Sequence, residues 1–203
     1  MKVHRKSTVM DLNDLIQVYD YTLPEDVCKN IIKLFQDQIL EEWDENGKPK
    51  FRQFNITQYI DDHEHELDQH PQQDWGLIQN ALIESATHYV QKYMDDTGVR
   101  PYFPKRSALE QFRVKKYEKG TDDRFDMHVD VGDHDSARRF LSVFWYLNDV
   151  DEGGETEFLD GAFTVKPKTG RMVIFPPLWM YPHCGKPTKS HDKYLLSTYT
   201  HYV

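Results

Sequence analysis

Apolar side chains recur at helical spacing in two stretches of the N-terminal half of the chain. In the first stretch, Pro24 is followed by two acidic residues, which suit the opening turn of a helix, and apolar positions repeat every three or four residues up to about residue 40. In the second stretch, the same spacing runs from about Trp75 to Met94. The sequence therefore predicts two amphipathic helices here.

The segments around these helices show other patterns. Residues 12–22 alternate apolar and polar side chains, which predicts an edge strand, and residues 51–60 also have strand-like character. Residues 61–74 are polar almost throughout, and this composition predicts a surface loop.

From about residue 108 the pattern changes to short strand-like runs separated by Gly, Asp, Asn and Pro. Eight such runs follow one another to the C-terminus, which predicts a double-stranded β-helix, or jelly roll. The expected fold class is α+β, with the N-terminal helices packed on one face of the jelly roll. We expect a single domain over 1–203, with a helical N-terminal layer at 1–107 and the jelly-roll core at 108–203.

Charge and cysteine content narrow the classes of partner. The net charge of −9 repels phosphate backbones, so nucleic acid is disfavoured as a partner. Arg113, Lys115 and Lys116 form a candidate local basic patch, for which the alternative is ordinary solvated strand charge. Two cysteines make no disulfide framework, and no signal peptide or membrane span is visible in the sequence. These features predict a cytoplasmic protein without a membrane partner.

A candidate metal site begins with His-x-Asp in the run that ends at Asp130. Alternate side chains of a strand point to the same face, so His128 and Asp130 converge if this run is extended. His183 lies between two later strand-like runs and is the candidate third ligand. Two histidines and one carboxylate on one face leave coordination positions open, which is the arrangement of non-heme Fe(II) oxygenases.

His-x-Asp alone is a weak signal, because a surface histidine on a strand is the commoner explanation of such a dipeptide. Other histidines compete for the role. His63 and His65 lie in a polar segment, and His134 lies in an acidic turn, so a solvated position is the simpler interpretation of each. Whether His128 binds a metal must therefore be judged from the motifs around it.

Several short motifs follow one another in a specific order in this half of the chain. They are Tyr117-Glu-Lys-Gly120, His128-x-Asp130, Phe144-Trp-Tyr146-Leu-Asn148, Gly153-Gly154-Glu-Thr-Glu-Phe158, Lys166-Pro-Lys-Thr-Gly170, His183-Cys-Gly185-Lys-Pro187 and Lys193-Tyr194. This series resembles the prolyl 4-hydroxylase-like family of Fe(II)/2-oxoglutarate-dependent dioxygenases. The resemblance spans about residues 110–202 and extends weakly into the N-terminal layer.

The resemblance implies a role for each matched residue. The implied iron ligands are His128, Asp130 and His183. The implied partner of the distal carboxylate of 2-oxoglutarate is Lys193, and an ammonium buried inside the sandwich does need an anion. The implied further contacts to this cosubstrate are Tyr146, Tyr117 and Ser197. Both tyrosines have a second interpretation as core aromatics.

The expected substrate contacts are Arg139, Tyr199 and Trp179. Arg139 matches a position that contacts the peptide in prolyl hydroxylases of the family, and its alternative is an exposed strand arginine. Tyr199 stands where the family often has a tryptophan against which the target proline packs. This departure keeps an aromatic surface and weakens the prolyl assignment. Trp179, just before the distal histidine, is expected near the pocket rim, with core or lid packing as the alternative.

Two loops next to the expected site are acidic. Residues 131–137 follow the His-x-Asp motif, and residues 149–152 carry three acidic side chains. An acidic rim favours basic or neutral peptides by electrostatic steering.

The resemblance implies hydroxylation of a substrate C–H bond coupled to decarboxylation of 2-oxoglutarate to succinate. The implied cofactors are Fe(II), 2-oxoglutarate and O2, with ascorbate as a further candidate. The favoured reaction is peptidyl-proline 4-hydroxylation of a proline-containing peptide or protein. The alternatives are another side chain, a small molecule, a nucleic-acid demethylase, or a non-catalytic metal-binding module of cupin type. Lys193 favours an enzyme, because a module that binds only metal has no use for this cation.

Overall fold

Antiparallel pairing arranges the strands of this chain in two sheets. The computed structural model describes residues 11–38, 41–44, 49–63 and 70–203. The larger sheet has the order β1 (Gln17–Tyr19), β10 (Arg171–Phe175), β7 (Arg139–Tyr146), β12 (Lys193–Tyr202), β5 (Arg113–Tyr117), β3 (Pro49–Asn55) and β2 (Glu41–Asp44), with β4 (Ser107–Leu109) also paired to β12. The smaller sheet has the order β6 (Phe125–His128), β11 (His183–Gly185), β8 (Thr156–Phe158) and β9 (Phe163–Val165).

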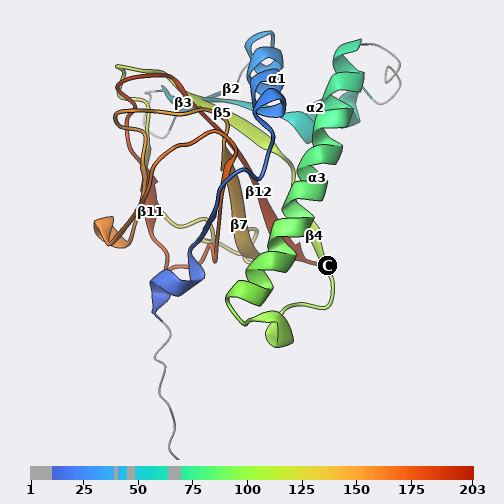
Figure 1. The fold of residues 1–203 in the computed structure, drawn as a ribbon, viewed down its shortest axis with the longest axis vertical. Helices are drawn as coiled ribbons and strands as arrows, with labels where there is room; N and C mark the ends of the chain where they lie inside the picture. The colour runs from blue at the N-terminus through green and yellow to red at the C-terminus, as the bar shows by residue number, and fades with distance from the viewer. Residues whose placement is uncertain (1–10, 39–40, 45–48, 64–69) are drawn as a thin grey trace, which may run out of the picture.

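The larger sheet is covered on both faces. Figure 1 shows α1 (Glu25–Gln36) and α3 (His70–Asp96) on one side of it and the smaller sheet on the other. Successive side chains of β7 alternate between the two faces of the sheet. Val143 and Trp145 belong to the hydrophobic cluster under the helices, and Phe144 and Tyr146 belong to the cluster between the sheets. A jelly roll with helices on one face is thus confirmed.

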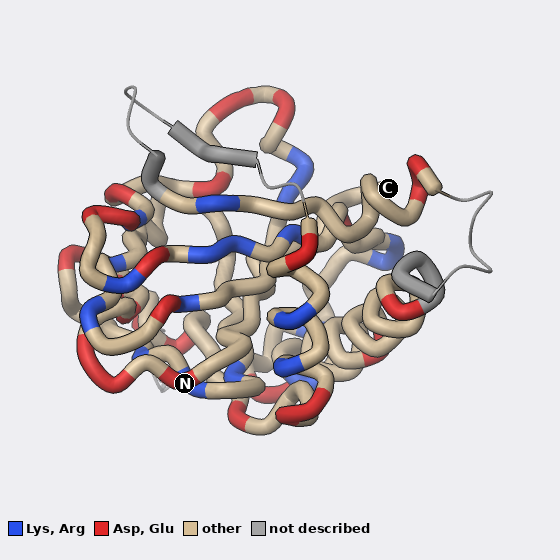
Figure 2. The backbone as a smooth tube through the Cα atoms, turned by 90° about the horizontal axis from the view of Figure 1, so that it is seen from above, with Lys and Arg blue, Asp and Glu red and all other residues tan. Residues whose placement is uncertain are grey.

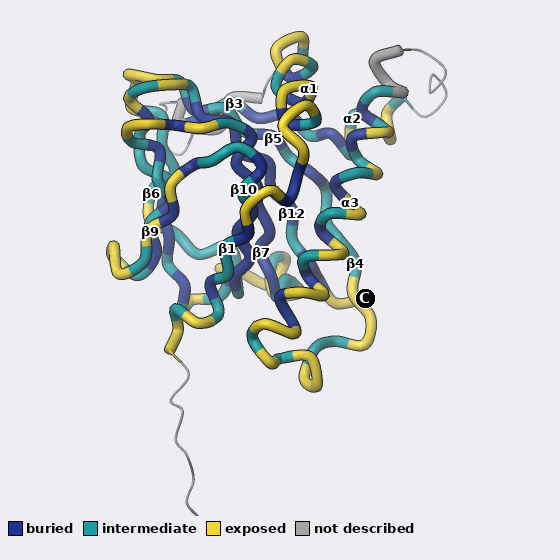
Figure 3. The backbone as a smooth tube through the Cα atoms, viewed as in Figure 1, coloured by how far each residue is buried: buried dark blue, intermediate teal, exposed yellow. Residues whose placement is uncertain are grey.

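The two predicted helices are present with shifted ends. α1 begins directly after Pro24, ends earlier than expected, and buries Cys28, Ile31 and Phe35 against the sheet. α3 is longer than expected and buries a stripe of residues along its length, as Figure 3 shows. The buried residues of α3 are Trp75, Ile78, Leu82, Ala86, Val90, Tyr93 and Met94. Residues 39–40, where the first helix was expected to end, lie outside the described residues.

The prediction of a strand over 12–22 is right only for Gln17–Tyr19. A 3-10 helix, Leu12–Leu15, precedes this strand. The side chain of Asp11 accepts a hydrogen bond from the backbone of Asn13, and that of Asp14 accepts one from the backbone of Asp11. This reciprocal capping favours a helical turn over an extended start.

The prediction of a strand over 51–60 fails after Asn55. The side-chain oxygen of Asn55 accepts a hydrogen bond from the backbone of Gln58 and starts the short helix α2 (Ile56–Asp62). The loop expected at 61–74 is wrong at both ends, because α2 extends into it and α3 begins inside it. Residues 64–69 lie outside the described part of the chain.

The N-terminal part contributes strands as well as helices. β1, β2 and β3 extend the larger sheet at its two edges, and β1 and β3 overlap the two N-terminal segments for which strands were expected. The first run expected after residue 107 forms two strands, β4 and β5, which gives nine strands in the fully described segment 107–203 instead of eight. The domain division at 107 stays a prediction. Within the described residues, no helix combines the length and the apolar character that crossing a membrane requires.

The interface between α3 and the larger sheet gives a test of the fold. Leu82 is fully buried there, whereas Leu77 on the same helix is 64% exposed. We expect Leu82→Ala to lower the free energy of unfolding by about 2–5 kcal/mol, because it leaves a cavity in the core. Leu77→Ala should change it by less than about 0.5 kcal/mol. Urea denaturation measures both, and equal effects would contradict this packing.

Candidate active site

Three side chains that can bind a metal meet between β6 and β11. His128 and His183 are direct partners in the pairing of these strands, and Asp130 follows β6 by two residues. Nε2 of His128 lies 3.5 Å from Oδ1 of Asp130, and Nε2 of His183 lies 3.7 Å from Oδ2. One donor atom from each residue lies within 4.8 Å of the other two. The three residues could therefore hold one metal ion.

Backbone contacts orient both imidazoles toward this point. Nδ1 of His128 lies 2.7 Å from the carbonyl oxygen of Asp126, and Nδ1 of His183 lies 3.1 Å from that of Tyr181. Each Nδ1–H donates to its carbonyl, which leaves a lone pair on Nε2. Nε2 of His128 and Oδ2 of Asp130 are buried and have no hydrogen-bond partner among the described residues. Orphaned buried acceptors that converge fit a cation between them.

The charge state of the cluster suits a divalent metal. Burial lowers the pKa of His183 to about 4, against the opposing charge of Asp130, so the imidazole is neutral at physiological pH. Burial acts to raise the pKa of Asp130, but hydrogen bonds and charges from its neighbours outweigh burial and lower it. A carboxylate with a neutral imidazole beside it belongs to the donor sets that hold divalent transition metals.

A buried ammonium lies in the same cavity. Lys193 at the start of β12 is 1% exposed, and its Nζ donates a hydrogen bond to the carbonyl oxygen of Gly154 at 3.0 Å. The nitrogen also lies 4.2 Å from the ring centroid of Tyr117. No carboxylate of the described chain lies within 4.0 Å of it, and burial lowers its pKa to about 7. An anionic ligand would compensate this charge.

Two adjoining cavities lead to these residues. The inner one, about 40 Å³, is lined by Lys193, Tyr117, Ser197 and the metal-site residues. The outer one, about 470 Å³, shares His128, Asp130 and Ser197 with it and opens toward solvent. The inner cavity holds only a few water molecules. A larger ligand therefore requires side chains of its wall to move.

The chain was compared with known families and structures. Residues 112–201 match the family described as the 2OG-Fe(II) oxygenase superfamily.

This segment belongs to the 2OG-Fe(II) oxygenase superfamily.

Membership confirms the predicted family, the class of dioxygenase, and Fe(II), 2-oxoglutarate and O2 as the cofactors. No curated protein matches the chain.

Solved structures of prolyl hydroxylases share the fold of this chain. A viral collagen prolyl hydroxylase from Paramecium bursaria Chlorella virus-1 superposes with a TM-score of 0.61 at 19% identity, covering 93% of this chain and 96% of the other. A Trichoplax adhaerens prolyl hydroxylase bound to a hypoxia-inducible-factor peptide superposes with a TM-score of 0.62 at 15% identity, covering 94% of this chain and 85% of the other. A Pseudomonas putida prolyl-4-hydroxylase superposes with a TM-score of 0.55 at 15% identity, covering 95% of this chain and 97% of the other.

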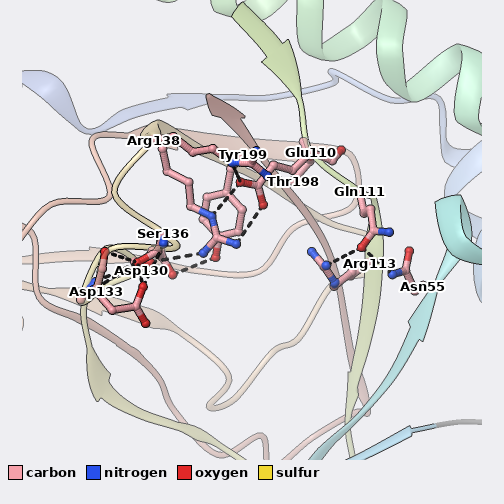
Figure 4. A network of polar contacts seen from close by, with 12 residues as sticks. Asn55, Glu110, Gln111, Arg113, Asp130, Asp133, Ser136, Arg138, Thr198 and Tyr199 are labelled. Carbon is pink, nitrogen blue, oxygen red and sulfur yellow. Dashed lines mark hydrogen bonds and ion pairs between the residues drawn. The ribbon is translucent and has the colours of Figure 1, made fainter. Parts of the chain in front are cut away.

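Two of the expected substrate residues contact Asp130, Tyr199 through its carboxylate and Arg139 through its backbone carbonyl. The hydroxyl of Tyr199 donates to Oδ1 of Asp130 at 2.9 Å, as Figure 4 shows. The guanidinium of Arg139 lies 4.1 Å from the centroid of the Tyr199 ring and donates to both carboxylate oxygens of Glu110, at 3.0 and 2.8 Å. Both side chains also line the outer cavity, and their contact with a substrate stays a prediction.

Sequence reasoning missed Glu110. Its carboxylate is nearly buried and compensates Arg139, which lies over the ring that contacts Asp130. An isolated acid in a strand-like run gives no signal of this kind, because its partner is distant in sequence.

The structure separates the remaining expected residues. Tyr117 and Ser197 line the inner cavity, and their contacts with the cosubstrate stay a prediction. Tyr146 is fully buried outside that lining, and its hydroxyl donates to Oγ1 of Thr156 at 2.6 Å, so it stands one layer behind the wall. Trp179 is 76% exposed and lines neither cavity.

The paired glycines of the oxygenase allow close packing behind Lys193. Gly153 has φ +76° and would place a Cβ 2.5 Å from the carbonyl oxygen of Pro187. Gly154 has φ +73°, and its carbonyl accepts the hydrogen bond from Lys193. A side chain at either position would disturb the wall that holds this lysine.

The contacts of Asp130 predict a graded loss of metal affinity. His128→Ala removes a donor, so Co(II) binding measured by calorimetry should fall below detection. Tyr199→Phe removes only the hydrogen bond to Asp130 and should weaken binding by about 10-fold. His134→Ala is the control, because this histidine is fully exposed. Unchanged binding in His128→Ala would exclude this metal site.

Proposed function

We propose that this chain hydroxylates a C–H bond of a peptidyl proline. The observation that carries the proposal is one cavity wall that joins the converging donor atoms of His128, Asp130 and His183 to the ammonium of Lys193, which has no carboxylate partner among the described residues. Fe(II) bound at the three donors supplies the redox chemistry that couples conversion of 2-oxoglutarate and O2 into succinate and CO2 to insertion of one oxygen atom into the substrate.

In this proposal the protein residues bind and orient the reactants. His128, Asp130 and His183 would hold the Fe(II) through one donor atom each. The Tyr199 hydroxyl fixes the carboxylate of Asp130. Lys193 binds the distal carboxylate of 2-oxoglutarate, for which its Nζ must turn from the carbonyl of Gly154.

Apolar side chains cover part of the wall around the metal-site residues. Phe125 stacks on the ring of His128, with centroids 3.7 Å apart, and Phe144 and Leu195 line the inner cavity. A low local dielectric strengthens the pairing of Lys193 with a carboxylate and limits access of water to the iron.

The choice of a prolyl substrate rests on the fold and on one aromatic ring. The structural neighbours are prolyl hydroxylases, and one of them is bound to a peptide. Tyr199 offers a ring at the cavity wall, although it stands where the family often has tryptophan. Arg139 is held by Glu110 and offers a fixed edge to a peptide. A role for ascorbate stays a prediction.

Lys193 should make cosubstrate binding depend on pH. Its pKa of about 7 in the ligand-free site lies below the usual lysine value, so the ammonium is largely lost as the pH rises through 7. We expect the affinity of the Zn(II)-loaded protein for 2-oxoglutarate to fall by up to about tenfold per pH unit above that point.

The arginine variant provides the comparison. Lys193→Arg keeps a positive charge over the whole range, so its affinity should vary little with pH. Calorimetry between about pH 6.5 and 8.5 measures the affinity of both proteins for 2-oxoglutarate. Their affinity for Zn(II) is measured over the same range as a control. Equal slopes would show that this lysine does not bind the carboxylate.

Turnover tests the proposed function directly. The Fe(II)-loaded protein is incubated with 2-oxoglutarate and O2, and succinate is quantified with and without proline-rich peptides. We expect peptide to stimulate succinate formation and to gain the mass of one oxygen atom, in the wild type and in His134→Ala but not in His128→Ala. Succinate without peptide stimulation would redirect the search to small molecules. No succinate despite bound iron would refute the oxygenase.

A further inference from the structure

Alternate residues of β5 face the two cavities. Arg113, Lys115 and Tyr117 share one face of the strand. Their cross-strand partners on β12 are Ser197, Leu195 and Lys193, which line the same space. The intervening Lys116 points to the other face of the sheet. The candidate basic patch of the sequence is therefore divided between two sides of the sheet.

Lys115 forms no salt bridge among the described residues, although the charge of Asp130 attracts it. It is half-buried and lines both cavities together with His128 and Asp130. Its Nζ lies over the rings of Phe51 and Phe125, 5.2 and 5.1 Å from their centroids. In the part of the chain that the structure describes, no carboxylate lies within 4.0 Å of this nitrogen. Aromatic faces attract an ammonium but do not neutralise it.

Arg113 adds a second cation to the outer cavity. Its Nη2 donates to the amide oxygen of Gln111 at 2.6 Å, and Figure 4 draws this neutral contact. Arg139, on the same cavity wall, is instead paired with the carboxylate of Glu110. Among described residues, Arg113 has no acid within salt-bridge distance.

Acidic side chains expected at the rim of the site form contacts with other residues. Asp149 accepts hydrogen bonds from Thr169, and Glu152 pairs with Lys189, so neither lines the outer cavity. Asp133 does line it, but its carboxylate accepts the hydroxyl and backbone N–H of Ser136 within its own turn. Figure 2 shows the same division, with most acids in loops and turns and several Lys and Arg along the strands.

We propose that the substrate presents a carboxylate to Lys115 and Arg113, close to the C–H bond that is hydroxylated. The inference rests on the proposed function and names the chemical class of its substrate. An acidic side chain beside the target residue of a peptide supplies such a group, and so does a small-molecule carboxylate such as a free amino acid. A cavity of about 470 Å³ has room for either.

Peptide selection tests this inference without turnover. The full chain is loaded with Zn(II) and 2-oxoglutarate, which occupies the metal and Lys193, and is then equilibrated with three peptide pools. Each pool has a central proline flanked by randomised positions, biased toward Asp and Glu, toward Asn and Gln, or toward Lys and Arg. Retained peptides are read by mass spectrometry. We expect enrichment of acidic peptides by about tenfold or more over amide-containing ones.

Four variants assign the effect to the two cations. Lys115→Met and Arg113→Gln should each lose most of the enrichment, whereas Lys115→Arg should retain it. Lys116→Met is the matched control, since it removes the neighbouring charge, which pairs with Asp192 on the opposite face. Thermal unfolding verifies that each variant is folded, and the Arg113→Gln result carries the test if Lys115→Met is not.

Each outcome either distinguishes a peptide from a small molecule as the source of the carboxylate or overturns the inference. Binding of free proline and other small carboxylates, weakened by Lys115→Met and without retention of any peptide, supports a small-molecule source. Preference for neutral or basic peptides, or the same acidic preference in Lys115→Met as in wild type, overturns the inference. The proposed function fails separately, because a protein that selects acidic peptides but forms no succinate has the carboxylate site without the oxygenase reaction.

Discussion

The pairing of β12 between β5 and β7 is the constraint on which the site depends. β12 contributes to both faces of the larger sheet, so one run of sequence supplies Tyr194 and Leu196 to the core under the helices and Lys193, Ser197 and Tyr199 to the cavities. A shift of one residue in this pairing would exchange the two sets. The apolar side chains that the helices bury therefore also fix which polar groups face the metal-site residues.

Polar groups inside this sandwich are only partly satisfied by the protein. Among the described residues, Nε2 of His128 and Oδ2 of Asp130 have no hydrogen-bond partner, and the ammonium of Lys193 donates to the carbonyl of Gly154 but has no carboxylate beside it. Such groups destabilise a fold unless a ligand completes them. Here the groups at the two ends of the cavity differ in charge. The acceptor atoms at the metal site suit a cation, and the ammonium of Lys193 suits a carboxylate. The surrounding aromatic core supplies the stability that makes this arrangement tolerable.

Much of the fold and site could be predicted because it depends on local pattern. Strand alternation indicated that His128 and Asp130 share a face, and helical spacing indicated the buried stripes of α1 and α3. Element boundaries failed where a side-chain cap decided them, as at Asn55. Contacts between distant segments gave no sequence signal. Tyr146 has its hydroxyl taken by Thr156, and Lys115 differs from Lys116 only in the face it occupies.

The position of Tyr199 limits how the chain can change over evolution. Its hydroxyl holds Asp130 while its ring lies beneath Arg139 and borders the outer cavity. A substitution at this position would change the wall of the outer cavity and the hydrogen bond to Asp130 together. The shape of the cavity and the support of this carboxylate are thus coupled through one side chain. Diversification of the substrate would proceed through residues that border the cavity without contacting Asp130, and the face of β5 offers them.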